Sequence, residues 1–515
     1  MHLALYINEI ISLICDNLKA PDVDTVSLGR LARTCRVFTE PALDALWEMQ
    51  ESLGPLTQVM PPDLWISELG VHRGKLGHRG KVITFRRDLV DTDWKPRLEY
   101  YGRKIRLLHQ SCFVACVVHH DVFTAISAYR PIRILLPNLR SVFLNLGHPY
   151  FSKAIPFFQC ILGTNVREIS IRYHGMAKAS SLPRLLSTIP RLCPNVQSFR
   201  IGSSTKLPPS SNSNLYHCLI CLDNLREVEI DMTDSIPTGE VINHLAHLSS
   251  LEAWSGAIIP WTPESLFFTT DGQRFENLHE FLFTATTWEA AAKLVKDMRC
   301  AFTLLDVSIN NPDSSEVELS TFEQLLDAFT ERHPASTSLS SLRITGDVAI
   351  HQYSSEAQKS FLHKMRNLFS LQSLRNLEID VQAVSLLDDS WISGAATAWP
   401  GLQQLSLDGR GTPHATLAGW VPLLKNCAEL ELLHITSIFR PFSTKLLSGV
   451  CNAHITHIGS QASVLESPTA VFRCLTAMFP RLRSVYNDSN REDEQGEDWD
   501  QLKKMLDESG ECSTW

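Results

Sequence analysis

Cysteine and histidine side chains at close spacing are the first candidates for chemistry in this sequence, because both residue types bind zinc. Cys112 and Cys116 lie four residues apart and are followed by His119 and His120. Structural zinc sites, however, usually present paired cysteines about two residues apart. The apolar residues around Cys112 and Cys116 instead predict a buried helix, on which the two thiols lie one turn apart and pack as small apolar groups.

The rest of the sequence offers no catalytic arrangement. His217-Cys218 and Cys221 have no second ligand pair and precede a predicted strand. The sequence has no G-x-x-x-x-G-K-[ST] phosphate loop, no strand-anchored G-x-G-x-x-G, no G-x-S-x-G and no H-E-x-x-H. We therefore expect a protein that is not an enzyme and that uses no cofactor and no metal ion. A metal-dependent or thiol enzyme built on Cys112, Cys116 and His119 is the weakest alternative.

One pattern of apolar residues recurs along most of the chain. In the copy at 222–232, Leu225, Val228 and Ile230 are separated by charged residues, and from Val228 onward polar and apolar residues alternate. Such alternation predicts a strand with one face in a core and the other in water. Copies begin at Leu139, Val166, Val196, Leu278, Leu339, Leu374, Leu402 and Leu430, with weaker ones at Leu251, Phe302, Ile455 and Leu482. Most follow one another at about 24 to 30 residues, which is the period of a leucine-rich repeat.

These repeats predict an α/β fold. Each strand is followed by a loop and a helix, so a right-handed leucine-rich-repeat solenoid should form, with parallel strands on its concave face and helices on its convex face. We expect an all-helical module at 1–48, a connector and N-terminal cap of the solenoid at 49–130, repeats at 131–490 and an acidic, solvated tail at 491–515 with a short helix near 500–506.

The first 48 residues predict three short helices. The first carries an apolar stripe, the second runs from about Ser27 through Phe38, and Pro41 opens the third. Three helices of this length cannot bury all their apolar side chains among themselves, so a partner or the next domain should cover the surplus. The simplest alternative is that these helices only cap the repeat array.

The same residues resemble an F-box. The segments that carry the resemblance are Ile7–Leu18, Leu28–Phe38 and Pro41–Trp47. The family pattern opens with L-P-x-E-I-L, has V-C-[KR]-x-W at its centre and closes on L-W; here Asn8 replaces the opening proline and Phe38 the central tryptophan. With its repeats, the chain is similar to the F-box and leucine-rich-repeat proteins of mushroom-forming (basidiomycete) fungi.

The resemblance implies the substrate-recognition subunit of an Skp–cullin–F-box ubiquitin ligase. The helices would dock on the Skp adaptor and, through it, join a cullin–RING ligase, while the repeats hold a protein client. The implied adaptor-binding residues are Ile7, Ile10, Ile11, Ile14, Leu28, Leu31, Phe38 and Leu46. The alternative is a non-enzymatic leucine-rich-repeat scaffold that binds proteins and whose N-terminal helices are only a cap.

The water-facing positions of the strands are the candidate client-binding surface, because parallel stacking joins them into one polar face. The charged and polar candidates are Arg172, Arg200, Glu227, Glu229, Asp231, Asp306, Arg343, Glu378, Asp380, Asp408 and His434. Since acidic residues dominate the later strands, a basic client segment should dock toward strands 227–408. The alternative is that these charges only keep an exposed sheet soluble.

Composition limits the class of protein further. The formal net charge is −9, and the last 25 residues carry nine acidic and three basic residues. Nucleic acid is therefore an improbable partner, although 73–106 holds eleven basic and four acidic residues. Thirteen scattered cysteines, among them Cys160, Cys193, Cys300, Cys427 and Cys474 in apolar contexts, predict reduced, buried thiols. With no signal-length or membrane-length apolar run, we expect a cytoplasmic or nuclear protein away from membranes.

Overall fold

The computed structural model describes most of the chain. The residues it describes are 7–19, 25–71, 79–94, 97–110, 116–129, 134–146, 155–173, 181–203, 205, 209–232, 237–259, 275–298, 300–310, 319–331, 338–346, 355–447, 449–460, 462–487 and 494–511. They form two compact units, Met1–Ser235 and Ile236–Trp515, and each is treated by itself.

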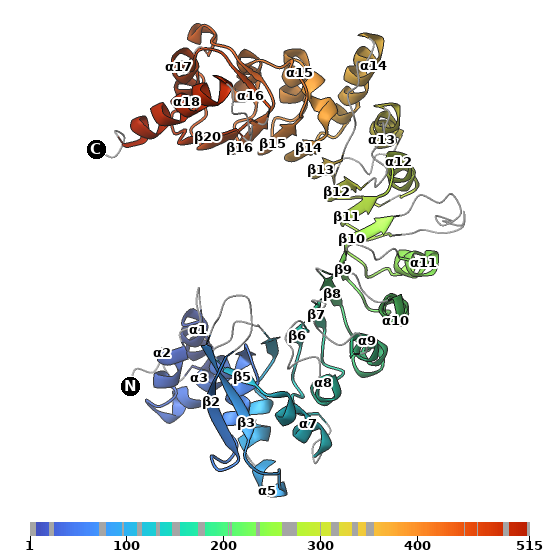
Figure 1. Ribbon diagram of the computed structural model, residues 1–515, viewed down its shortest axis with the longest axis vertical. Coiled ribbons are helices and arrows are strands. Elements are labelled where there is room, and N and C mark those ends of the chain that lie inside the picture. Colours follow the sequence, from blue (N-terminus) through green and yellow to red (C-terminus); the bar gives the residue numbers. More distant parts are fainter. Residues whose placement is uncertain are drawn as a thin grey trace. The chain divides into compact units, whose positions relative to one another are not determined.

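The first unit contains a parallel sheet of repeat strands. In spatial order they are β1 (Met49–Gln50), β4 (Leu107–Gln110), β6 (Ser141–Asn145), β7 (Glu168–Tyr173), β8 (Ser198–Ser203) and β9 (Glu227–Met232). Val142, Ile169, Phe199 and Val228 lie side by side in register and are buried. Helices α7 (His120–Ala128), α8 (Ile155–Ile161), α9 (Ser181–Leu192) and α10 (Pro209–Ile220) cover one side of these strands (Figure 1).

The second unit repeats this arrangement. Its strands, again in spatial order, are β10 (Ala253–Ile259), β11 (Glu280–Ala285), β12 (Leu304–Ile309), β13 (Ser341–Thr345), β14 (Asn376–Asp380), β15 (Gln404–Asp408), β16 (Leu432–Ile435), β18 (His457–Gly459) and β20 (Ser484–Tyr486). Its helices are α11 (Gly239–His247), α12 (Trp288–Asp297), α13 (Leu319–Glu331), α14 (Ser355–Met365), α15 (Asp389–Ala398), α16 (Val421–Asn426) and α17 (Pro468–Met478). Each pair of neighbouring strands from β10 to β20 is parallel. The predicted α/β repeat fold is confirmed.

Local sequence explains why these elements begin where they do. Thr287 caps α12, since its hydroxyl accepts a hydrogen bond from the Ala290 amide at 3.2 Å. The consensus positions Leu377, Leu405 and Leu433 stack on adjacent strands with almost no exposed surface. Each repeat therefore buries its apolar face against its neighbours, which is how a repeat array builds a core. The five cysteines expected in apolar contexts are buried.

The helical module has three helices, but their limits differ from the prediction. They are α1 (Asn8–Asn17), α2 (Thr25–Leu31) and α3 (Arg36–Glu48). The second helix ends at Leu31, so Phe38 belongs to α3, and Pro41 lies inside α3 instead of opening it. Pro41 is the sixth residue of α3 and has no N–H to donate to the Val37 carbonyl, so this helix lacks one hydrogen bond of its first turns.

The connector is more structured than predicted. It contains α4 (Gly54–Gln58), α5 (Asp91–Trp94), α6 (Arg97–Gly102) and a separate small sheet of β2 (Trp65–Val71), β3 (Arg79–Phe85) and β5 (Cys116–Val118). The predicted helix through Cys112 and Cys116 is wrong. Cys116 begins β5, whose valines favour a strand and pair with β3, and Cys112 lies outside the described residues. Because β1 and β4 already belong to the repeat sheet, the repeats also begin before residue 131.

The predicted tail is partly right where the structure describes it. The short helix near 500–506 is present, but it belongs to a longer helix that is packed and not solvated. Residues Glu494–Glu511 form one helix, α18, which packs against α17. Trp499, Leu502 and Leu506 are buried, and their i, i+3, i+7 spacing places them on one face of the helix. The described acidic side chains of α18 lie on its remaining surface, so the acidic composition hid the length of the helix and its buried face. Within the described residues, no helix has the length and apolar character needed to span a membrane.

Candidate protein-interaction surfaces

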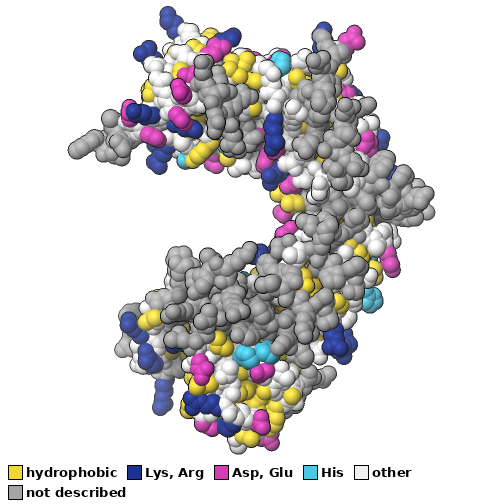
Figure 2. Space-filling view, viewed as in Figure 1, with side chains coloured by type: hydrophobic (Ala, Val, Ile, Leu, Met, Phe, Trp, Pro, Cys, Tyr) yellow, Lys and Arg dark blue, Asp and Glu magenta, His cyan; other side chains and the backbone are white. Residues whose placement is uncertain are grey.

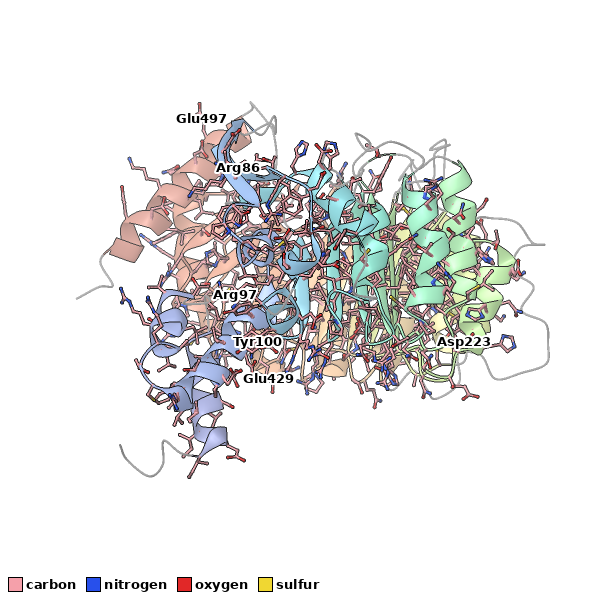
Figure 3. All side chains as sticks on the ribbon, turned by 90° about the horizontal axis from the view of Figure 1, so that it is seen from below. Arg86, Arg97, Tyr100, Asp223, Glu429 and Glu497 are labelled. Carbon is pink, nitrogen blue, oxygen red and sulfur yellow. The ribbon has the colours of Figure 1, made fainter. Side chains whose placement is uncertain are left out.

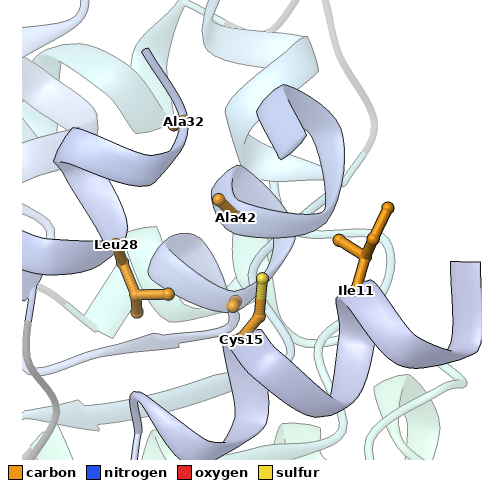
Figure 4. Close-up of a cluster of buried hydrophobic side chains, with 6 residues drawn as sticks. Ile11, Cys15, Leu28, Ala32 and Ala42 are labelled. Atoms are coloured by element: carbon orange, nitrogen blue, oxygen red, sulfur yellow. The ribbon is translucent and has the colours of Figure 1, made fainter. Parts of the chain in front are cut away.

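The helical module has a core of its own. Ile11 and Cys15 of α1 pack with Leu28 of α2 and with Ala32, which directly follows that helix. Ala42 and Ala45 of α3 complete the cluster (Figure 4). Burial raises the pKa of the Cys15 thiol, and the neighbouring Asp16 adds to this effect. The module is therefore held together by side chains that point inward, and any partner must contact other residues.

Two of the eight predicted adaptor-binding residues are in this core. Ile11 and Leu28 have no exposed surface, so they shape the module and cannot form an external contact in this conformation. Ile7 is 47% exposed. The other five are half-buried, and they are Ile10, Ile14, Leu31, Phe38 and Leu46.

Among the described residues of the module, the sequence interpretation missed the most exposed apolar side chains. Leu13 of α1 is 61% exposed, and Val26 at the start of α2 is 59% exposed. On α1, Ile10 and Leu13 are three residues apart and lie beside each other on the flank of the core stripe. The signal was present, because Leu13 is an apolar residue that does not fit the spacing of the buried residues Ile11 and Cys15.

The opposite flank of the module is tied to the connector. Lys104 donates hydrogen bonds to Glu40 at 2.8 Å and to Asp44 at 2.5 Å, and the Tyr100 hydroxyl donates to Glu40 at 2.6 Å. Tyr100 lies on α6 beside the module (Figure 3), and the ring of Trp47 is 4.4 Å from that of Tyr101. One side of α3 is thus fixed to the first unit.

Electrostatics support this attachment. Partial burial disfavours the charge on Lys104, but the hydrogen bonds to Asp44 and Glu40 outweigh it and raise the pKa of the ammonium group. The hydrogen bond from Lys104, helped by that from Tyr100, lowers the pKa of the Glu40 carboxyl group. At neutral pH the Lys104 ammonium group and the Glu40 carboxylate are therefore both charged and attract each other.

The predicted client-binding residues of the first unit lie on β7, β8 and β9. Arg172 and Arg200 are exposed, and the Arg172 guanidinium lies 5.9 Å from the centre of the Phe143 ring. Arg200 pairs with Glu227 at 2.9 Å and with Glu229 at 3.6 Å on the neighbouring strand. Asp231 is also exposed on β9. Part of the acidic character of β9 is therefore neutralised from within the sheet.

The same pairing occurs in the second unit. Arg343 on β13 lies between two acidic strands, 3.0 Å from Glu378 and 4.0 Å from Asp306. Burial raises the pKa of Asp306, and Arg343 partly offsets this. Basic and acidic side chains consequently lie next to each other on this unit (Figure 2). Asp380 is half-buried at the end of β14. The structure shows a mixed surface here and does not test the predicted preference for a basic client.

Two predicted client-binding residues meet in a hollow near the end of the second unit. Asp408 and His434 line a hollow of about 310 Å³ with Tyr486 and Lys503. Gly459 is required here, because a Cβ atom at this position would lie 2.6 Å from the His434 ring. The hollow combines a carboxylate, an imidazole, a phenol and an ammonium group, which suits a polar side chain of a bound protein.

Among the described residues, one cluster of three possible metal ligands is found, and it consists of His119, His120 and Asp121. Their ligand atoms lie within 4.8 Å of one another at the start of α7. The Asp121 carboxylate is 3.1 Å from His119 Nδ1 and 3.2 Å from His120 Nε2. Three ligands are one fewer than a closed tetrahedral zinc site uses.

The sequence interpretation also missed a recurring asparagine that precedes several of the repeat strands. The side-chain amides of Asn165, Asn195, Asn224 and Asn277 each donate to a carbonyl of the preceding repeat, at 2.8, 3.0, 3.3 and 2.7 Å. Each bond satisfies a carbonyl in the loop that follows a helix. The sequence shows this signal, because in each of these copies an asparagine directly precedes the first apolar residue of the repeated pattern. These residues hold neighbouring repeats together.

Comparisons with known proteins add little to this geometry. No family model matches the chain, and no curated protein matches it. Among solved structures, the chain is similar to one in the crystal structure of the Rad7 and Elc1 complex in yeast. The TM-score is 0.37 and the identity 12%, over 95% of this chain and 91% of that chain.

Proposed function

We propose that this protein is the substrate-recognition subunit of an Skp–cullin–F-box ubiquitin ligase and catalyses no reaction itself. The observation that carries the proposal is the asymmetry of the helical module. One flank is fixed to α6 through Lys104, whereas Leu13, Val26 and Ile7 expose apolar surface although the module has a complete core of its own. Apolar side chains that stay exposed beside a complete core are candidates for contact with a partner.

The repeats supply the second part of the proposal. Their strands present charged and polar side chains on a rigid parallel sheet in each unit, which suits recognition of a protein client by shape and charge. The resemblance to an F-box, carried by residues 7–47, then links client binding to the Skp adaptor and a cullin–RING ligase.

The alternative function is a scaffold whose N-terminal helices are only a cap. It is favoured by one observation: α3 runs directly into β1, the first strand of the repeat sheet. A terminal helix that covers the end of a repeat array needs no partner.

Co-purification of the full chain with the Skp adaptor tests the proposal. We expect the wild type to form a stable complex and the Leu13→Asp/Val26→Asp variant to lose it, because two charges would enter an apolar interface unpaired. Both side chains are more than half exposed, so the variant should still fold. Far-UV circular dichroism checks this.

Ser12→Asp is the matched control. It places a charge on the same helix, but at an exposed residue that lines the groove toward α6 together with Lys104. The control should retain the adaptor. If the folded wild type does not bind the adaptor, the helices are a cap and the scaffold function replaces the ligase function. If all three proteins bind it equally, Leu13 and Val26 are not part of the contact.

A further inference from the structure

Three arginines that directly precede neighbouring strands of the first unit surround a hollow with no role in the proposed ligase function. The hollow has a volume of about 530 Å³ and is lined by Arg106, Arg140, Arg167, Asn138 and Asn165. This arginine hollow lies at the N-terminal ends of β4, β6 and β7. Its volume falls within the range of about 300 to 1,000 Å³ that is typical of ligand sites.

The sheet places the three arginines in a row. The Arg140 amide donates to the Arg106 carbonyl at 2.7 Å, and the Arg167 amide donates to the Arg140 carbonyl at 2.7 Å. Each arginine therefore stands directly before its strand, about 4.8 Å from the next in the hydrogen-bonding direction. The three guanidinium groups line the same hollow and carry like charges, so an anion bound between them would relieve their mutual repulsion.

Few other groups in the described structure neutralise these charges. Arg106 lies 3.5 Å from Glu48, which also pairs with Lys19 at 2.5 Å. Arg167 donates to the Asn195 carbonyl at 3.1 Å. Among the described residues, the Arg140 guanidinium makes no hydrogen bond or ion pair, and the residues that line the hollow include no carboxylate.

The asparagines of the hollow contribute further donors. Asn138 and Asn165 each use one amide N–H to bind a backbone carbonyl of the preceding repeat, at 2.6 and 2.8 Å. A side-chain amide has two N–H groups, so each carries a second one. Planar guanidinium groups bind phosphate oxygens in pairs of parallel hydrogen bonds, which a lysine cannot do.

We propose that the arginine hollow binds a phosphate group, with Arg140 as its central ligand and Arg106 and Arg167 on either side. The hollow is large enough for a phosphate together with the residue or small molecule that bears it. The inference does not depend on adaptor binding, because Leu13 and Val26 are not among the residues that line the hollow.

Isothermal titration calorimetry of the full chain at low ionic strength tests the proposal, with inorganic phosphate, pyrophosphate and O-phosphoserine as separate probes. We expect at least one probe to bind and Arg140→Gln to weaken its affinity by about tenfold or more, since a charge-assisted hydrogen bond is lost. Tighter binding of O-phosphoserine than of the inorganic anions would identify a phosphorylated side chain as the source. The reverse order would identify a free phosphate compound.

Arg191→Gln is the matched control, because Arg191 is exposed on α9 and carries the same charge away from the hollow. It should bind the probes like the wild type. The proposal is overturned if no probe binds, if Arg140→Gln binds as tightly as the wild type, or if Arg191→Gln weakens binding equally. Arg140→Gln should still co-purify with the Skp adaptor, so failure of this site and failure of the ligase function can be told apart.

Discussion

Replacing Trp499 tests whether the C-terminal helix is an integral part of the second unit. Trp499 is 1% exposed, and its ring centre lies 5.1 Å from that of Phe439. Truncation of a buried tryptophan to alanine costs about 3–5 kcal/mol, through lost burial and the cavity left behind. We expect Trp499→Ala to lower the free energy of unfolding of the second unit by that amount, because α18 covers the end of its repeat array.

Urea unfolding followed by far-UV circular dichroism measures the change, and limited proteolysis shows whether 494–511 becomes accessible. Asp500→Ala is the matched control on the same helix. The Asp500 carboxylate is 80% exposed and 3.7 Å from Lys503, so its removal should change the free energy by less than about 0.5 kcal/mol. If Trp499→Ala unfolds like Asp500→Ala, the helix does not stabilise the unit and the reasoning is refuted.

Two further predictions concern the attachment of the module and the hollow at Gly459. Lys104→Met should lower the free energy of unfolding by about 1 kcal/mol at pH 7, a small effect because Glu40 and Asp44 are more than half exposed. Because the folded-state pKa of Glu40 is lowered, its contribution to stability is present above the unfolded pKa of about 4.3 and is lost as the pH falls through the folded value. Wild type and variant should therefore converge in urea titrations once the pH is below that folded value. Gly459→Ala should destabilise the second unit by about 1–3 kcal/mol, because the new Cβ would displace the His434 ring, whereas Gly401→Ala, with open space around it, should be nearly neutral in the same assay. Equal effects of the two alanines would contradict the close approach at Gly459.

The repeat strands could be predicted from the sequence because the same signal occurs many times. A single L-x-x-L-x-L match is weak, but copies at near-constant spacing require a common structure, and the register of Phe199 beside Val228 follows from aligning the copies. Elements that occur once had no such support. The strand at Cys116–Val118 was mistaken for a helix, since three residues are too few to reveal their periodicity.

The limits of the module helices could not be predicted for a different reason. Sequence spacing alone placed Phe38 on the second helix, whereas the turn after Leu31 is set by how α2 and α3 pack around Leu28 and Ala42. The same packing decides that Ile11 is buried while Leu13 is exposed. An apolar stripe identifies a helix face that needs burial, but whether the chain itself or a partner buries it depends on tertiary contacts.

Binding surfaces were harder still to predict, because charge along a strand does not measure charge available to a partner. The row of acidic residues on the later strands predicted a preference for a basic client, yet Arg343 pairs with Glu378 within the sheet. In the sequence, by contrast, Arg140 is a single arginine in a loop and carries no sign of a binding site. Only the alignment of β4, β6 and β7 brings it between Arg106 and Arg167. In a repeat protein, a stacked row of like charges therefore indicates a ligand better than their number in the sequence does, because neighbouring strands fix the distance between them.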